Sequence, residues 1–308
     1  MVASSLRACA RCGRPLRSAR GCACGGGTVP SAATDSEPRS AGGDYAAWRD
    51  AQPKATWGMP ALEATLERRF RQLALPIALF AAWAAVHTGL LHMLLRTVLS
   101  MWVHELGHAI AAWMCGRFAF PGPWFTPVGA ERTWIVVVLL AAGLGYGVFR
   151  FWRTRKPWSV FLILAFLAQI YCTFMLPERK AMALIIWSGD GGCMVLGTLL
   201  MLSLYARKHS QLRVGWLRWG FLVIGAAAFA DGFGTWWAAR TDRDVIPFGE
   251  NEGQGPSDPT VLIYQQGFSI PGLVNGYVWL GLVCLAVLLA AYVWGLRAER
   301  DTHEVEDA

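Results

Sequence analysis

Charge is what this sequence has least of. Only 16% of its 308 residues are charged, whereas 55% are hydrophobic and 16 are tryptophans. Soluble domains carry about a quarter charged residues, so this balance indicates a membrane protein. The net charge of +7 is accounted for by basic residues in short loops between apolar segments, and no nucleic-acid partner is expected.

Two further shortages exclude other classes of protein. Residues 1–30 contain no apolar run of the kind found in a secretory signal peptide, so a cleavable signal is not expected. The chain has only six histidines. This number excludes the histidine-cluster di-iron enzymes of membranes, because they need several more intramembrane histidines.

Long apolar runs dominate the rest of the chain. From Arg71 onward, runs of roughly 20 residues recur, which is the length that crosses a bilayer as a helix. The candidate spans are 71–88, 90–116, 133–151, 158–176, 181–205, 216–238 and 273–296. The predicted fold class is an all-α polytopic transmembrane bundle of about six to seven spans. It is expected to occupy 67–297, with a polar tail at 298–308.

Loop charges predict the orientation, because basic loops favour the cytoplasm. The basic residues in question are Arg68, Arg69, Arg71, Arg153, Arg155, Lys156, Arg207, Lys208, Arg213 and Arg218. The acidic loop 239–272, which includes Asp258, belongs on the other side. Seven full crossings would put Arg153–Lys156 on the wrong face, so one segment is expected to be re-entrant or miscounted. The Pro-rich stretch 117–132 is a candidate for dipping into the membrane without crossing it.

The segment 102–113, WVHELGHAIAAW, combines apolar residues with ionisable side chains on adjacent helical turns. His104 and His108 are four positions apart and therefore lie on one face of a helix. Two imidazoles in this arrangement can bind one zinc ion, with Glu105 beside it as a general base. A backbone carbonyl could satisfy either histidine alone, but the pair together with Glu105 favours metal binding.

A catalytic zinc ion needs a third protein ligand. The other histidines are poorly placed, which leaves two carboxylates inside later apolar segments, Asp190 and Asp231. Asp190 is favoured because Gly189 and Gly191 flank it and let a helix open locally. Asp231 is the alternative ligand, and either carboxylate could instead cap a break in a helix.

With His104-Glu105-Leu106-Gly107-His108 in one apolar helix and Asp190-Gly191-Gly192 in a later one, the sequence resembles the site-2 protease family of intramembrane zinc metalloproteases. The resemblance covers roughly residues 71–205. It implies that His104, His108 and Asp190 bind the catalytic zinc and that Glu105 is the catalytic base. It also implies hydrolysis of peptide bonds in membrane-anchored proteins, and a membrane-dipping segment after the first motif.

The N-terminus holds a second group of candidate metal ligands. They are Cys9, Cys12, Cys22 and Cys24. Cys9 and Cys12 have the spacing of a zinc knuckle, whereas Cys22 and Cys24 are one residue closer than usual, and so short a segment has no core without a metal. We therefore predict a zinc-ribbon-like module over 1–27, which would bind a regulatory partner, followed by a flexible linker over 28–66. A disordered tail with incidental cysteines is the alternative.

Together these features predict an intramembrane zinc metalloendopeptidase that acts on membrane-anchored proteins. Zn²⁺ is the expected cofactor, with one catalytic ion and a second, structural ion in the N-terminal module. Composition and loop charge predict a multi-pass protein of a bacterial inner membrane with a cytoplasmic N-terminus. The alternatives are a non-catalytic scaffold or sensor that retains a structural zinc, and a zinc hydrolase acting on lipid. Glu105 favours an enzyme, because a scaffold needs no base beside the metal.

Overall fold

The computed structural model describes residues 60–153, 156–206, 216–251 and 255–306. Contacts divide the chain into two units, Met1–Pro60 and Ala61–Ala308, and the second contains the helical bundle. The predicted zinc-ribbon-like module with its four cysteines lies outside the described residues, as does the predicted linker up to residue 59.

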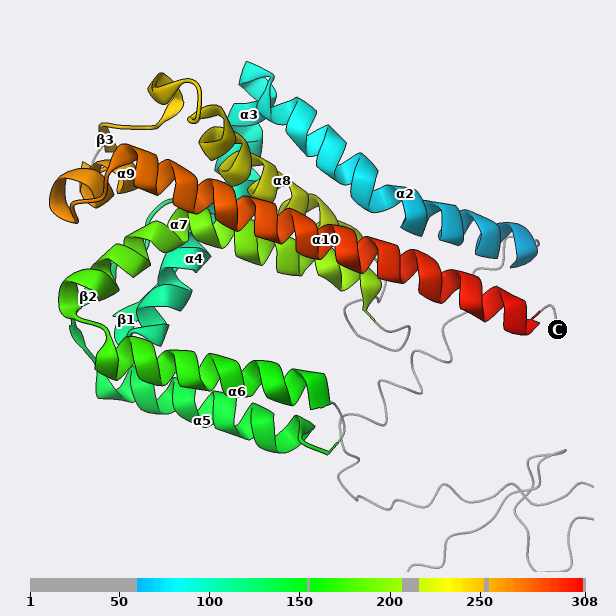
Figure 1. The fold of residues 1–308 in the computed structure, drawn as a ribbon, viewed down its shortest axis with the longest axis horizontal. Helices are drawn as coiled ribbons and strands as arrows, with labels where there is room; N and C mark the ends of the chain where they lie inside the picture. The colour runs from blue at the N-terminus through cyan, green and yellow to red at the C-terminus, as the bar shows by residue number, and fades with distance from the viewer. Residues whose placement is uncertain (1–59, 154–155, 207–215, 252–254, 307–308) are drawn as a thin grey trace, which may run out of the picture. The chain divides into compact units, whose positions relative to one another are not determined.

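The described chain is almost entirely helical, as predicted (Figure 1). Its α-helices are α2 (Pro60–Val86), α3 (Gly89–Leu94), α4 (Met101–Met114), α5 (Trp134–Phe151), α6 (Lys156–Ile170), α7 (Glu178–Leu202), α8 (Leu217–Ala238), α9 (Asp258–Thr260) and α10 (Ile270–Glu306). Short 3₁₀ or π-helical turns are η1 (Leu95–Ser100), η2 (Tyr171–Met175), η3 (Ser203–Tyr205), η5 (Arg243–Val245) and η6 (Val261–Gln265). Two antiparallel pairs complete it: β1 (Arg117–Ala119) with β2 (Val128–Arg132), and β3 (Glu250–Asn251) with β4 (Gly255–Pro256).

The helical unit extends beyond its predicted limits at both ends. α2 begins at Pro60, inside the predicted linker 28–66, and α10 continues to Glu306, through most of the predicted polar tail 298–308. The first extension, 60–66, contains two Ala and two Leu, and the second, 298–306, contains three Glu, and all of these are strong helix formers. Helix propensity therefore carries each helix past the end of its apolar run.

Fewer segments of the described chain could cross a membrane than the seven candidates from the sequence. Five helices in the described chain are long and apolar enough to cross: Trp134–Phe151, Lys156–Met175, Glu178–Tyr205, Leu217–Ala238 and Ile270–Arg297. The first two candidates, 71–88 and 90–116, form a pair bent by 110° that counts as at most one further span. The bend follows from Thr88, whose extended backbone (φ −115°) ends the helix before Gly89.

A count of six crossings removes the conflict in the loop charges. With the bent pair as one crossing, the helices that follow it alternate in direction. Arg69, Arg153, Lys156 and Arg218 then lie at one face, and the loop with Asp258 lies at the opposite face. The segment 117–132, the predicted membrane-dipping stretch, forms the β1–β2 hairpin.

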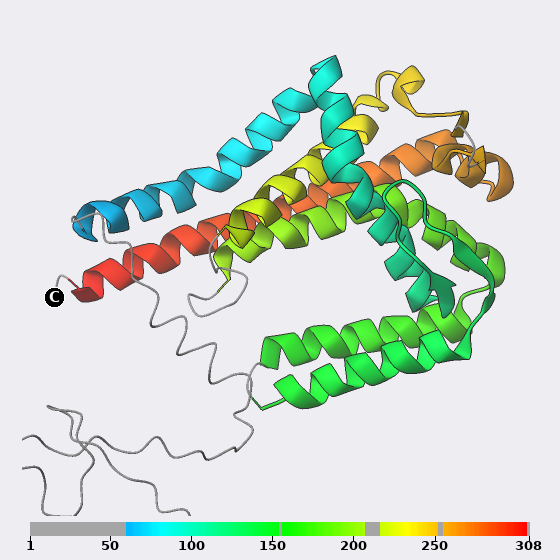
Figure 2. The same ribbon diagram turned by 180° about the vertical axis from the view of Figure 1, so that it is seen from behind.

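Helix α7 is the centre of the bundle, where α8 and α10 run beside it in both views (Figures 1 and 2). Small residues allow the closest approaches. A Cβ on Gly197 would lie 2.7 Å from the Gly225 carbonyl oxygen of α8, and one on Gly192 would lie 2.6 Å from the Cα of Gly107 in α4. Such contacts between small residues are how helices pack in membranes, where lipid competes with any apolar side chain.

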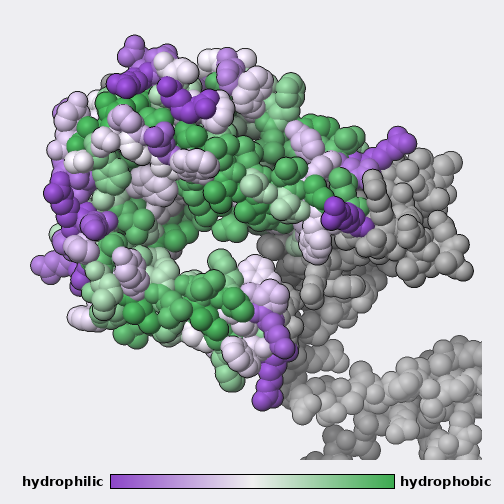
Figure 3. All heavy atoms as spheres, viewed as in Figure 1, coloured by the Kyte–Doolittle hydropathy of each residue, from purple (hydrophilic) through white to green (hydrophobic). Residues whose placement is uncertain are grey.

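Helices α5 and α6 form a separate hairpin that joins the bundle at one end. Figure 3 shows an open space between this hairpin and the bundle, with apolar side chains on both sides. At the join, Thr173 donates to the carbonyl of Met114 (2.9 Å) at the end of α4, and Cys172 and Leu176 pack against an apolar cluster of α4 and α7. Gly116, with φ of 74°, ends α4 in the left-handed conformation that glycine adopts without strain.

Candidate metal centre

The predicted pair of histidines lies on the face of α4 that packs against α7. His104 and His108 are each 9% exposed, and Glu105 is 4% exposed. The two helices approach closely because Gly107 has no side chain: a Cβ there would overlap the Ser188 carbonyl oxygen. Glycine at this position therefore brings the histidines against the backbone of α7.

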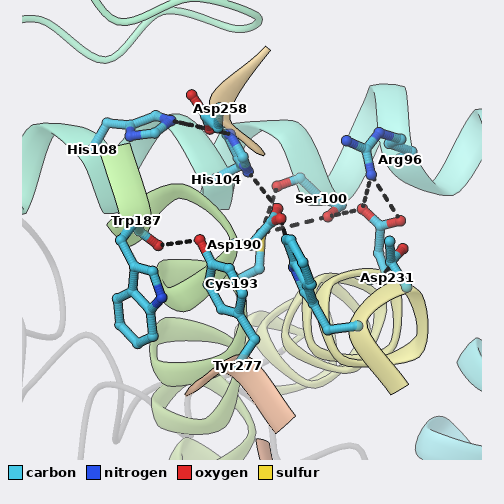
Figure 4. A network of polar contacts seen from close by, with 12 residues as sticks. Arg96, Ser100, His104, His108, Trp187, Asp190, Cys193, Asp231, Asp258 and Tyr277 are labelled. Carbon is cyan, nitrogen blue, oxygen red and sulfur yellow. Dashed lines mark hydrogen bonds and ion pairs between the residues drawn. The ribbon is translucent and has the colours of Figure 1, made fainter. Parts of the chain in front are cut away.

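Hydrogen bonds at Nδ1 fix the orientation of both imidazole rings. His108 donates from Nδ1 to the carbonyl of Ile185 (2.7 Å), and Nδ1 of His104 lies 3.1 Å from Oδ1 of Asp190 (Figure 4). An Nδ1 that donates leaves a lone pair on Nε2. The two Nε2 atoms lie 3.1 Å apart, so two lone pairs point at the same small volume.

Asp258 supplies a third ligand atom at this point. Its Oδ2 lies 3.0 Å from Nε2 of His104 and 3.1 Å from Nε2 of His108. His104, His108 and Asp258 form the group in the described residues whose ligand atoms all lie within 4.8 Å of one another. Two imidazole nitrogens and a carboxylate oxygen this close together could hold a metal ion, and this set of ligands suits zinc.

Asp258 is held in place by the turn in which it lies. It opens the short helix α9, after Ser257 and before Pro259, in the loop between α8 and α10. The Ser257 amide donates to the carbonyl of Gly249 (2.9 Å), and the Ser257 hydroxyl bonds to that of Thr260 (2.8 Å). Burial acts to raise the pKa of the Asp258 carboxyl, but hydrogen bonds from His104 and His108 outweigh it and hold this pKa well below its usual range.

Asp190, the predicted third ligand, also contacts His104, but at Nδ1, the ring nitrogen opposite the one that faces Asp258. Its Oδ1 contacts Nδ1 of His104, and its Oδ2 accepts a hydrogen bond from Trp236 Nε1 (2.8 Å). Trp236 is fully buried and stacks on Tyr277. In this arrangement Asp190 orients the ligand His104 and makes it more basic, which is the usual role of a carboxylate behind a metal-bound histidine.

Asp231, the alternative ligand from the sequence, has other partners. It accepts a hydrogen bond from Ser100 (2.6 Å), and its carboxylate contacts His92 and Arg96. These contacts form a second polar cluster beside the metal group, beyond Ser100 in Figure 4. Within the described residues, the group that could hold a metal does not include Asp231.

Gly189 leaves the space that a metal ion needs. A Cβ at this position would lie 2.6 Å from Nε2 of His104 and 2.6 Å from Nε2 of His108. The side chain of any other residue would therefore fill the coordination volume. The glycines around Asp190 were predicted to let the helix open, but α7 is continuous from Glu178 to Leu202. Gly189 instead leaves room beside the Nε2 atoms of His104 and His108.

The three ligand residues and Glu105 line a cavity of about 410 Å³. Its other walls come from the β1–β2 hairpin, from the first turns of α7 and from the loop between α8 and α10. Thr126, in the hairpin, donates to the carbonyl of Glu105 (3.0 Å) and ties that wall to α4. A metal held by three ligands at the wall of a cavity keeps a position open for substrate, as catalytic zinc sites do.

The candidate metal ligand that the sequence analysis did not identify is Asp258. It was noted only as one of the acids that give its loop a negative charge. The stretch Ser257-Asp258-Pro259-Thr260 carries a signal, since Ser, Asp and an early Pro mark a helix start that would hold a carboxylate in a fixed turn. Nothing in that pattern, however, points to α4 as its partner.

Comparisons of the chain with protein-family models, with curated proteins and with solved structures find no match.

Proposed function

We propose that this protein is a membrane-embedded zinc metalloendopeptidase that hydrolyses peptide bonds in membrane-anchored proteins. The observation that carries the proposal is the convergence of His104 Nε2, His108 Nε2 and Asp258 Oδ2 at one point of a cavity that Glu105 also lines. Buried acceptors behind both histidines support it, because they set the tautomer that zinc binding needs.

The residues of the cavity have separate roles in this proposal. Zinc, when bound, supplies a Lewis acid that polarises a carbonyl group and makes water more acidic. His104, His108 and Asp258 hold the ion, and Asp190 orients His104. The Glu105 carboxylate accepts a proton from the attacking water and delivers it to the amine that leaves. The alternative from the family resemblance, Asp190 as the third ligand, would need Asp190 to turn from Nδ1 of His104 towards Nε2.

The cavity lies between α4 and α7, and the loop that carries Asp258 forms one of its walls. In a six-crossing arrangement this loop lies opposite the basic helix ends, which favour the cytoplasm. We infer a cytoplasmic N-terminus and a site nearer the external face of a bacterial inner membrane. A substrate helix would have to unwind to present its peptide bond there.

The proposal is tested by zinc content and by cleavage of a membrane-anchored reporter, measured on the same purified full-length preparations. Glu105→Gln is expected to keep its zinc and to lose about 10²-fold or more in rate, as expected when a general base is removed. Glu131→Gln is the matched control, because Glu131 is exposed in β2 and outside the cavity. Zinc without cleavage in the wild type would support the scaffold alternative, and absence of zinc would refute both.

The N-terminal cysteines are proposed to bind a second, structural zinc and through it to present a surface for a regulatory partner. Four thiolates in so short a segment support this. Replacing all four with serine is expected to lower the zinc content of the full chain by about one ion and to leave reporter cleavage intact. Unchanged zinc content would refute the module.

A further inference from the structure

Three ionisable groups in the apolar segments have no role in the proposed chemistry. Asp231 is 3% exposed and accepts a hydrogen bond from Ser100 (2.6 Å). Nε2 of His92 lies 2.9 Å from its Oδ1, and Nη1 of Arg96 lies 3.3 Å from each carboxylate oxygen. Charged groups in such segments are costly to insert and are usually retained for a function.

Arg96 belongs to the wall of the metal cavity as well as to this cluster. Its side chain is 36% exposed, whereas that of Asp231 behind it is 4% exposed. In the described part of the chain, the hydrogen bonds of the guanidinium use Nη1 alone. The N–H groups of Nε and Nη2 are therefore left for a ligand in the cavity.

The local backbone explains how Arg96 reaches this position. It lies in η1, a π-helical segment directly before α4. π-helical turns are rare and often occur at functional sites. Here η1 presents both Arg96 and Ser100 to Asp231 of α8, and the carboxylate fixes the side chain of Arg96 against the cavity. Asp231 is therefore a positioning residue.

Arg96 is the permanent positive charge of this cluster, and Ser100 and His92 each lie within hydrogen-bond distance of one Asp231 oxygen. Arg96 is also the member of the cluster that lines the same cavity as His104 and Glu105.

The spacing along the helix sets the place of the ligand relative to the metal. Arg96 and His104 are eight positions apart, which is at most about 12 Å along the helix axis, because the π-helical η1 rises less per residue than an α-helix. An extended peptide advances about 3.3 Å per residue and covers this distance in about three to four residues. Arginine favours carboxylates because its planar N–H groups bind both oxygens.

We propose that Arg96 binds an acidic side chain of the substrate, about three to four residues from the peptide bond that is cleaved. The inference rests on the proposed function, since it locates the acid relative to the metal centre. It defines the substrate class as membrane-anchored proteins with an Asp or Glu near the cleaved bond on one side only.

The test uses the full-length Glu105→Gln protein, loaded with zinc, in detergent micelles. The probes are fluorescein-labelled peptides of Ala and Leu that carry one Asp at each position in turn, and the same peptides with Asn. At one register the Asp peptide is expected to bind about tenfold or more tightly than the Asn peptide, by fluorescence anisotropy. Arg96→Gln removes this difference. Arg179→Gln, at an arginine that lies outside the metal cavity, retains it.

Further variants separate binding from folding. Arg96→Gln leaves Asp231 with one donor fewer, so Arg96→Gln combined with Asp231→Asn provides a version without the unpaired charge. Arg96→Lys is expected to keep part of the preference, because lysine retains the charge but not the fork. Zinc content equal to that of the parent verifies the fold of each variant.

Three results would overturn the inference. These are no difference between Asp and Asn peptides at any register, a difference that survives Arg96→Gln, or displacement of the peptide by phosphatidylglycerol only when Arg96 is present. The last result would assign the site to a lipid phosphate. Selective binding of Asp peptides by a protein that cleaves no reporter would uphold Arg96 and refute the proposed function, so the two failures are distinguishable.

Discussion

Gly189→Ala is the sharpest perturbation of the metal centre, because it adds one carbon atom at the point where the ligands meet. The new Cβ would lie 2.6 Å from Nε2 of both His104 and His108. Non-bonded carbon and nitrogen atoms need about 3.5 Å, so the rings must retreat by about 1 Å. Zinc–nitrogen bonds are about 2.0–2.1 Å and tolerate deviations of about 0.2 Å. The rings can move in the metal-free protein, but they cannot then hold the ion.

The expected result is a zinc affinity about 100-fold or more below that of the wild type, with the fold retained. Alanine favours a helix over glycine by about 1 kcal/mol, so the helix itself should not be weakened. Zinc titration measures the affinity, and thermal unfolding of the full chain measures whether the fold is retained. Gly234→Ala is the matched control, because the nearest atom to its Cβ would be Val86 Cγ1 at 4.0 Å.

Wild-type zinc affinity in Gly189→Ala would refute this geometry, provided that His108→Ala loses the ion in the same assay. The melting temperatures are compared between the metal-free proteins, because loss of a bound ion by itself lowers the melting temperature. A lower value for the metal-free variant than for the metal-free wild type would count against the geometry, since the clash would then be a packing defect of α4 against α7. Zinc loss with an unchanged or higher melting temperature of the metal-free protein is the outcome that the structure predicts.

Three other predictions follow from the site and its walls. Asp258→Asn is expected to weaken zinc binding more than Asp190→Asn, whose cost should be about 10–100-fold, and the reverse order in a zinc titration would make Asp190 the ligand. Zinc is expected to bind more weakly as the pH falls, because protons compete with the metal for the imidazole nitrogens. The lowered pKa of Asp258 keeps that carboxylate charged while the histidines are protonated, so retention of zinc to about pH 4 in equilibrium dialysis would argue against histidine ligands. Arg117 is 2% exposed, donates to the carbonyls of Gly129 (2.7 Å) and Ala130, and pairs with Glu178. Arg117→Met should cost about 2–4 kcal/mol and lower the thermal midpoint, and an unchanged midpoint would show that the hairpin is held elsewhere.

The parts of the site that could be predicted from the sequence are those fixed by local geometry. His104, Glu105 and His108 share a helix, and helical spacing alone places the two histidines on one face. The approach of Asp190 was also predictable, because Gly191 and Gly192 beside it are residues that let helices pack closely. Which ring nitrogen Asp190 faces depends on a rotation within the packed bundle, and no spacing encodes that.

The rest depends on contacts that sequence patterns do not carry. His104 and Asp258 are separated by 154 positions, and their contact results from the return of the chain through α8 and its loop. The number of spans has a similar origin. Apolar content is equally high on both sides of Thr88, so composition predicts two crossings there, whereas the backbone bends by 110° and joins them.

The loop origin of Asp258 has a consequence for biosynthesis. The histidines of α4 leave the ribosome early, and a nascent chain that ends between α4 and α9 contains His104 and His108 without Asp258. Under the proposed function, a third ligand from this loop completes the metal centre only after α8 has been synthesised. The nascent chain would then stay inactive, and the proposed activity would arise when the bundle is almost complete.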